Sequence, residues 1–142
     1  MKMLKILLVE DNPGDIKLLE EALKDTRVAV DLQFVKDGAE ALAFLKKEGK
    51  YSKVWRPDLI LLDLNLPKID GREVLAEVKS DPNLKRIPIV VLTSSRAKED
   101  MLQAYGLLAN CYIAKPDNLN EYISVVKTIM NFWSSAEVPS ET

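Results

Sequence analysis

The segment Asp58–Pro67 limits what this chain can fold into more than any other stretch. It reads Asp-Leu-Ile-Leu-Leu-Asp-Leu-Asn-Leu-Pro, a short apolar run that ends in an aspartate and a turn. An apolar run of this length between polar residues and a proline is typical of a strand buried on both faces of a parallel sheet. In open parallel sheets, ligands bind beyond the carboxyl ends of the strands. Asp63 therefore stands where such a fold exposes a functional side chain, although on its own it could equally begin a turn.

Similar apolar runs recur along the chain and alternate with helical patterns. The predicted strands cover residues 4–9, 28–34, 58–63, 87–92 and 110–114. The predicted helices start at residues 12, 37, 70 and 118, and one more is marked by Met101, Ala104, Tyr105 and Leu108. Strands that alternate with helices predict an α/β fold, in which helices cover both faces of a parallel sheet.

The pattern within each strand predicts its place in the sheet. The strands at 4–9, 58–63 and 87–92 are almost continuously apolar and are expected at the centre. The strand at 28–34 has the alternating pattern of a half-buried or edge strand, with the apolar residues Val28, Val30, Leu32 and Phe34. The last strand reads as the other edge. These assignments predict a flavodoxin-like (βα)5 three-layer sandwich with a five-stranded sheet of order 2-1-3-4-5.

Composition and charge exclude several classes of protein. A length of 142 residues fits one domain, predicted over residues 1–134, with a polar tail at 135–142. The net charge of −2 argues against direct DNA binding, and the basic loop 46–56 fits a solvated loop better than a nucleic-acid contact. The single cysteine, Cys111, excludes a disulfide framework, and no segment approaches the roughly 20 apolar residues that span a bilayer, so a cytoplasmic protein without a membrane segment is expected. The chain contains no histidine, which excludes Ser-His-Asp catalysis, histidine metal sites and phosphohistidine chemistry within it.

Polar residues follow or end four of the predicted strands: Glu10, Asp11, Asp63, Thr93 and Lys115. The predicted order places the three carboxylates together at the switch point of the sheet. Crowded carboxylates repel, so one of them should take up a proton unless a cation is present, and Mg²⁺ prefers such hard oxygen ligands. The set indicates metal-assisted phosphoryl transfer to a carboxylate, with Asp63 as the nucleophile. Taken singly, Asp11 could open a turn, Thr93 could cap a helix and Lys115 could be a solvated charge.

From Leu4 to about Trp133 the chain resembles the receiver domain of two-component response regulators. The resemblance is carried by the segments 7–13, 57–71, 90–94 and 112–116. It implies that Asp63 is the phosphoacceptor. It also implies that Mg²⁺, or Mn²⁺ in its place, is bound by Glu10, Asp11, Asp63 and the main-chain carbonyl of Asn65.

The same resemblance assigns roles to the last strands. Thr93 and Lys115 would contact the phosphoryl group, and the Lys115–Pro116 peptide bond would be cis, which X–Pro bonds tolerate. Tyr112 matches the switch aromatic of the family, whose ring turns inward when Thr93 is drawn toward the phosphate. A half-buried strand aromatic is a compatible interpretation of Tyr112.

A narrower resemblance is to the stand-alone regulators that partner phytochrome-type histidine kinases. Segments 63–68 and 108–112 and the pair Phe132-Trp133 carry it. It implies a phytochrome-type sensor kinase as partner. It also implies a homodimer through the fourth helix, the fifth strand and the fifth helix, in which Tyr105, Leu107 and Trp133 could take part, although core packing explains most apolar positions there.

We therefore expect a single-domain response regulator that takes a phosphoryl group on Asp63 from a histidine kinase. It would catalyse only its own phosphotransfer and dephosphorylation, and would signal to a downstream protein that the sequence does not identify. A Mg²⁺-dependent phosphatase would need a second acid or base near Asp63, and Asn65 and Ser95 are poor general bases. A flavin mononucleotide binder would need a phosphate-binding loop where this chain has Glu10 and Asp11. A phosphorylation-independent scaffold is disfavoured because the acceptor set is complete.

Overall fold

The computed structural model describes residues 3–94, 106 and 109–135 of the chain. Within these residues, one sheet contains five parallel strands in the order β2-β1-β3-β4-β5, which confirms the predicted flavodoxin-like order. The strands are β1 Leu4–Val9, β2 Val30–Val35, β3 Leu59–Leu62, β4 Ile89–Thr93 and β5 Cys111–Ala114. The helix predicted around Met101, Ala104, Tyr105 and Leu108 lies outside the described residues.

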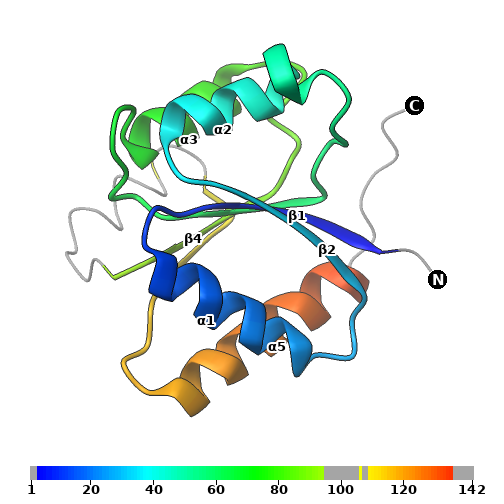
Figure 1. The fold of residues 1–142 in the computed structure, drawn as a ribbon, viewed down its shortest axis with the longest axis vertical. Helices are drawn as coiled ribbons and strands as arrows, with labels where there is room; N and C mark the ends of the chain where they lie inside the picture. Colours follow the sequence, from blue (N-terminus) through cyan, green and yellow to red (C-terminus); the bar gives the residue numbers. More distant parts are fainter. Residues whose placement is uncertain (1–2, 95–105, 107–108, 136–142) are drawn as a thin grey trace.

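Helices cover both faces of this sheet, as Figure 1 shows. α1 and α5 lie side by side on one face, and α2 and α3 lie on the other. The helices are α1 Pro13–Lys24, α2 Gly38–Leu45, α3 Gly71–Ser80 and α5 Leu119–Ser135. The helix α5 ends one residue beyond the predicted domain boundary at 134. No helix among the described residues has the length and apolar character needed to cross a membrane.

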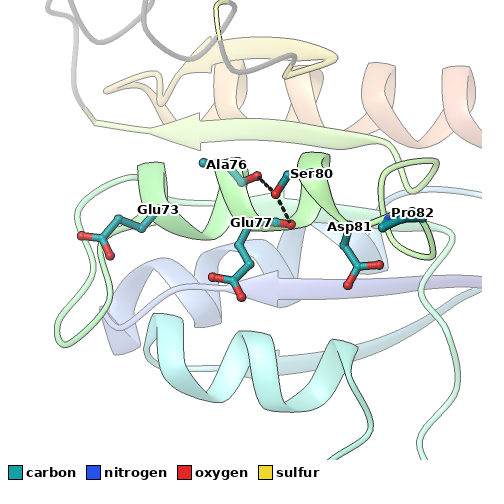
Figure 2. A pocket seen from close by; sticks show the side chains of 6 residues that line it. All are labelled: Glu73, Ala76, Glu77, Ser80, Asp81 and Pro82. Carbon is teal, nitrogen blue, oxygen red and sulfur yellow. Dashed lines mark hydrogen bonds between the residues drawn. The ribbon is translucent and has the colours of Figure 1, made fainter.

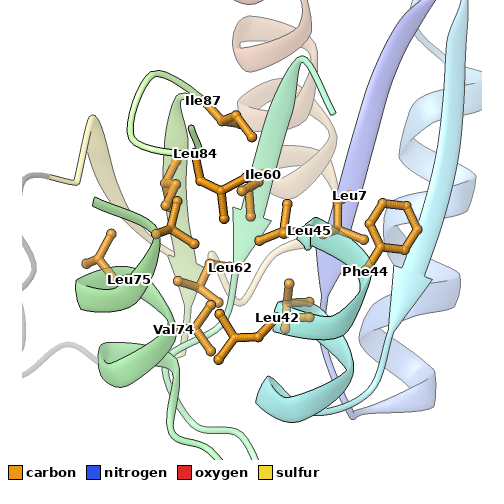
Figure 3. Close-up of a cluster of buried hydrophobic side chains, with 14 of the residues drawn as sticks. Leu7, Leu42, Phe44, Leu45, Ile60, Leu62, Val74, Leu75, Leu84 and Ile87 are labelled. Atoms are coloured by element: carbon orange, nitrogen blue, oxygen red, sulfur yellow. The ribbon is translucent and has the colours of Figure 1, made fainter. Parts of the chain in front are cut away.

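The hydrophobic core has two halves, one on each face of the sheet. Along β3, Ile60 and Leu62 point toward α2 and α3, whereas Leu59 and Leu61 point toward α1 and α5. Figure 3 shows the first half, where labelled strand residues meet the helical residues Leu42, Phe44, Leu45, Val74 and Leu75. All four residues of β3 are at most 1% exposed, and each buried aliphatic side chain contributes roughly 1.5–3 kcal/mol. Two-sided burial explains why the central strands are continuously apolar.

The strand β2 lies at one edge of the sheet, which confirms its prediction as a half-buried or edge strand. Its alternating apolar residues are unequally covered, and Phe34 is 43% exposed. Val30 and Leu32 are partly buried against the half of the core next to α1 and α5, and the fully buried residue of β2 is Val35 on the other face. An edge strand is covered only in part, so an alternating pattern does not fix which of its residues are buried.

The basic loop between α2 and β3 is attached to the domain by its aromatic side chains and a lysine. The indole N–H of Trp55 donates a 3.0 Å hydrogen bond to Asp31, and the Trp55 ring packs edge-on against Phe44. Lys46 forms a 2.8 Å ion pair with Glu77 of α3. The loop also contains a short 3₁₀ helix, Gly49–Tyr51, which the sequence analysis did not predict.

Candidate functional site

The carboxyl ends of the four strands β1, β3, β4 and β5 bring the predicted site residues together. Glu10 follows β1, Asp63 follows β3, Thr93 ends β4 and Lys115 follows β5. These four polar residues are all buried, with exposed fractions of 0–9%, whereas Asp11 is exposed. Polar groups buried to this extent need hydrogen-bond or ion-pair partners, so the geometry of the site follows from the contacts that they make.

The carboxylate of Asp63 is held from two sides. Its Oδ1 atom accepts a 2.7 Å hydrogen bond from the hydroxyl of Thr93 and a 3.2 Å hydrogen bond from the main-chain N–H of Asn65. Its Oδ2 atom lies 3.6 Å from the Nζ atom of Lys115, which is an ion-pair distance longer than a hydrogen bond. One oxygen of the carboxylate is therefore fixed, and the other faces a cation.

The turn after Asp63 requires the glycine at position 71. A Cβ atom added to Gly71 would lie 2.4 Å from the main-chain oxygen of Asp63 and 2.6 Å from the Cα atom of Leu64. The main-chain N–H of Gly71 also donates a 3.0 Å hydrogen bond to Leu64 O. Asp70 caps α3 by accepting the main-chain N–H of Arg72 at 2.8 Å. The sequence analysis identified Asp70 as a cap but missed the role of Gly71, whose only signal was a glycine at the first helical position.

Lys115 is surrounded by carboxylates. Its Nζ atom pairs closely with Glu10 and lies 2.9 Å from Oδ2 of Asp15 in the first turn of α1. Burial alone would lower the pKa of Lys115, but the hydrogen bonds to Glu10 and Asp15 outweigh this effect and hold the pKa above its ordinary value. Lys115 is therefore a charged ammonium at neutral pH. The sequence analysis missed Asp15 at this site, because an acidic residue in the first turn of a helix is common on general grounds.

The pKa of Glu10 is raised mainly by burial, with a smaller contribution from the neighbouring carboxylate of Asp63. Together these effects raise the pKa to about 7, while the hydrogen bond from Lys115 opposes both. This direction agrees with the sequence-based expectation that one carboxylate of the cluster takes up a proton. A divalent cation would favour the ionised form of Glu10 instead.

The acidic cluster fits a divalent metal ion. Glu10, Asp11 and Asp63 each offer a carboxylate oxygen, and these atoms lie within 4.8 Å of one another. With Asp15 included, four carboxyl groups surround the single ammonium of Lys115, and a divalent cation would offset this excess of acidic groups. Asp11 is exposed, so this side of the cluster is open to the water ligands that Mg²⁺ retains. The carbonyl of Asn65 as a further ligand stays a prediction.

Two assignments concern β5 and the residues after it. Tyr112 pairs with Val91 of β4 and is half-buried against the core on the face of α2 and α3. Its predicted role as a switch stays a prediction. The predicted cis bond before Pro116 is wrong, because the described residues contain no cis peptide bond. The trans form is the one that X–Pro bonds favour, by about 0.5–1 kcal/mol.

Comparison with known proteins identifies the family to which this site belongs. The family described as "Response regulator receiver domain" matches residues 6–127. The chain belongs to the response regulator receiver family. This receiver is 51% identical over 128 residues to the response regulator Rcp1 of Synechocystis sp., covering 90% of this chain and 87% of Rcp1. It is 37% identical over 129 residues to the probable methanogenesis regulatory protein FilR2 of Methanothrix harundinacea, covering 90% of this chain and 82% of FilR2.

Solved structures match the receiver over almost its whole length. The phosphorylated cyanobacterial phytochrome response regulator RcpA has a TM-score of 0.93 and 55% identity, covering 98% of this chain and all of RcpA. The Mn²⁺-bound form of Rcp1 has a TM-score of 0.90 and 48% identity, covering 96% of this chain and 99% of that one. The receiver is thus a response regulator of two-component signalling with a histidine kinase as partner. Rcp1 binds Mn²⁺ in that structure, and the acidic cluster of this receiver offers carboxylate ligands that fit a divalent metal ion.

The described residues also form a surface hollow along α3, shown in Figure 2. It is lined by Glu73, Ala76, Glu77, Ser80, Asp81 and Pro82. The hydroxyl of Ser80 donates within the helix, at 2.9 Å to Ala76 O and 3.1 Å to Glu77 O. None of the residues of the acidic site lines this hollow, so it is separate from the site at the strand ends.

Proposed function

We propose that the receiver is a phosphorylation switch that accepts a phosphoryl group on Asp63 from a partner histidine kinase. One observation carries this proposal. The Asp63 carboxylate is buried at the centre of the sheet edge, with Oδ1 fixed by Thr93 and Oδ2 directed toward Lys115. Asp63 also belongs, with Glu10 and Asp11, to the acidic cluster that fits a metal ion.

In the reaction, Oδ2 of Asp63 attacks the phosphorus atom of a phosphohistidine on the kinase. The new P–O bond forms as the P–N bond breaks, and the imidazole of the kinase leaves with the bonding electrons. Glu10, Asp11, Asp63 and the Asn65 carbonyl would hold a divalent metal ion, which would supply positive charge for the phosphoryl oxygens. The ammonium of Lys115 and the hydroxyl of Thr93 supply hydrogen bonds to the same oxygens.

The signal leaves through β4 and β5. Phosphorylation would draw the Thr93 hydroxyl from Asp63 to a phosphoryl oxygen, and the main-chain oxygen of Thr93 already accepts a 2.7 Å hydrogen bond from Lys115 N. A shift of Thr93 would therefore move the start of the β5–α5 connection and free space for the Tyr112 ring. The surface that changes would include β5 and α5, together with the predicted fourth helix, which lies outside the described residues.

This surface would bind a downstream protein or a second copy of the chain. Trp133 on α5 is half-buried and packs edge-on against Phe132, which is 60% exposed. Tyr105 and Leu107, the other predicted members of a dimer face, lie outside the described residues. The exposed ring of Phe132 beside the half-buried Trp133 supports a protein contact at the end of α5.

The remaining assignments follow from the same proposal. The protein would be cytoplasmic, would bind no DNA directly and would catalyse only its own phosphotransfer and dephosphorylation. Residues 1–134 would form the receiver domain, and residues 135–142 a polar tail. A phytochrome-type kinase as partner is supported by the likeness to RcpA, which is described as a phytochrome response regulator.

Intact mass after incubation with acetyl phosphate and Mg²⁺ tests the proposal. The expected result is one phosphoryl adduct on the natural chain, and none on Asp63→Asn or without Mg²⁺. The matched control is Asp58→Asn, which changes an aspartate at the other end of β3 that accepts a 2.9 Å hydrogen bond from Lys5 N. An unmodified natural chain under all conditions, or an adduct retained in Asp63→Asn, would contradict the proposal.

A further inference from the structure

A fourth carboxylate, that of Asp15, touches the buried lysine of the site. We propose that Asp15 is a positioning residue that competes with the phosphoryl group for Lys115 and so weakens the phosphorylated state. The inference rests on the proposed function, because it concerns the cation that the phosphoryl group must reach. It assigns to α1 a part in setting how readily Asp63 is modified.

The start of α1 fixes Asp15 in this position. The side-chain oxygen of Asn12 accepts the main-chain N–H groups of Gly14 at 2.9 Å and of Asp15 at 3.2 Å, and Pro13 is the first helical residue. This cap sets the direction of the first turn, so that the Asp15 carboxylate meets Lys115, which is 100 residues away in sequence. The Asp15 side chain is 31% exposed, whereas that of Lys115 is 9% exposed.

The contacts of Lys115 show why Asp15 competes. The ammonium has three N–H groups, and it pairs with Glu10 and Asp15 at hydrogen-bond range while Asp63 Oδ2 remains 3.6 Å away. A phosphoryl oxygen on Asp63 needs an N–H group of Lys115, so the ammonium must move toward Asp63. Because Asp15 is far more exposed than Glu10, whose side chain is 3% exposed, its pair with Lys115 is the one that is released at lower cost.

The charge of Asp15 acts in the same direction as its hydrogen bond. If Asp15 keeps its contact with Lys115, only the Lys115 ammonium separates its negative charge from that of the phosphoryl group. Removal of this charge should therefore strengthen binding of the phosphoryl group whether or not the contact breaks. A plain structural role, as an acid in the first turn of a helix, would change the stability of α1 and not the affinity for an anion.

Beryllofluoride, which mimics a phosphoryl group on aspartate, measures this affinity directly. At fixed Mg²⁺ concentration, Asp15→Asn is expected to bind it about three- to tenfold more tightly than the natural chain. Because Asp15 is partly exposed, the gain should shrink when salt is raised from about 50 to about 500 mM. Asp15→Glu keeps the charge and is expected to bind like the natural chain.

The matched control is Asp25→Asn. Asp25 lies at the other end of α1 and also forms a 2.9 Å pair with a lysine, Lys127 of α5, so its loss tests the removal of an equivalent pair away from the site. Its beryllofluoride affinity should equal that of the natural chain. Equal or weaker binding by Asp15→Asn, with binding by the natural chain intact, would overturn the inference and leave the proposed function standing.

A second measurement reports on the pair itself without metal or beryllofluoride. The side-chain ammonium signals in NMR spectra of the metal-free protein should include one for Lys115, because its carboxylate partners slow hydrogen exchange. Asp15→Asn should shift or broaden this signal, and Asp25→Asn should leave it unchanged. If the natural chain binds no beryllofluoride, the proposed function and the proposed competition both fail. If Asp15→Asn leaves the Lys115 signal unchanged, the pair between Asp15 and Lys115 does not form and only the proposed competition fails.

Discussion

The hydroxyl of Thr93 donates a 2.7 Å hydrogen bond to the carboxylate of Asp63 and so joins the ends of β4 and β3. The main-chain oxygen of the same threonine accepts the N–H group of Lys115 after β5. One residue therefore connects the proposed phosphoacceptor with the strand from which the signal leaves. Thr93 is fully buried, so any movement of its side chain is transmitted to its neighbours in the core.

Removal of the Thr93 hydroxyl tests this connection. Thr93→Val keeps the shape of the side chain but loses the donor. We expect phosphorylation by acetyl phosphate to slow roughly 10- to 100-fold, since a hydrogen bond to a charged group contributes roughly 1.5–3 kcal/mol. The change in the Tyr112 chemical shifts that beryllofluoride binding causes should also be lost. Thr93→Ser keeps the hydroxyl and should retain both responses; a Thr93→Val variant whose rate and Tyr112 shifts match the natural chain would show that the threonine has no such role.

A methyl group at position 71 should displace the main chain of the proposed phosphoacceptor, Asp63. Since the added Cβ atom would lie 2.4 Å from the Asp63 main-chain oxygen, Gly71→Ala forces the turn to shift, at a cost of about 1–3 kcal/mol in unfolding free energy. The displaced carboxylate should also accept a phosphoryl group more slowly. Gly49→Ala is the control, because its added Cβ meets nothing within 4 Å, although its φ of +56° makes the variant slightly strained. Its phosphorylation rate should not change, and an unchanged rate in Gly71→Ala would contradict the account.

The proton on Glu10 predicts a pH dependence of stability in the metal-free protein. The pKa of Glu10 in the folded chain is about 7, above its ordinary value of 4.5, so the folded state binds this proton more tightly than the unfolded state does. The stabilisation is complete below pH 4.5 and is lost as the pH rises through 7, by roughly 3 kcal/mol in all. Mg²⁺ should restore stability at neutral pH, because it favours the ionised carboxylate.

Urea unfolding of the natural chain and Glu10→Gln between pH 4.5 and 8 measures this effect. The variant cannot ionise at this position, so its unfolding free energy should fall less over the same range. Parallel curves for the two proteins would show that Glu10 does not carry the proton.

The two-sided core predicts a large difference between a central and an edge position. Ile60→Ala in β3 removes a side chain that is 0% exposed, and should lower the unfolding free energy by about 2–5 kcal/mol. Phe34→Ala in β2 removes a larger side chain that is 43% exposed, and should cost much less. Urea unfolding compares the two, and an equal or larger loss for Phe34→Ala would mean that Phe34 is covered in solution.

The sequence alone predicted the parts of this fold that depend on local pattern. The apolar runs of β1, β3 and β4 are buried on both faces, so their composition indicates a central place in the sheet. The residues that follow them then meet at one edge by topology, which is why Glu10, Asp63 and Thr93 were predicted together. The alternating pattern of β2 indicated an edge strand but not the exposure of Phe34, because the cover over an edge strand depends on which helices reach it.

Contacts between residues that are far apart in the sequence could not be predicted from local sequence patterns. Asp15 and Lys115 meet only because α1 and β5 are brought to the same end of the sheet. Gly71 is required by the close approach of the turn to the main chain of Asp63, and a glycine after an aspartate is also an ordinary helix start. Both features depend on distances that spacing along the chain does not fix.

The most direct test of the central claim is to locate the phosphoryl group at a single residue. After phosphorylation with acetyl phosphate and Mg²⁺, borohydride reduces an aspartyl phosphate to homoserine, and peptide mass spectrometry then identifies the converted position. The account predicts homoserine at residue 63, none at the neighbouring Asp11 and Asp15, and an unreduced Glu10. Conversion at another aspartate, or a phosphorylated chain with an unaltered Asp63, would contradict it.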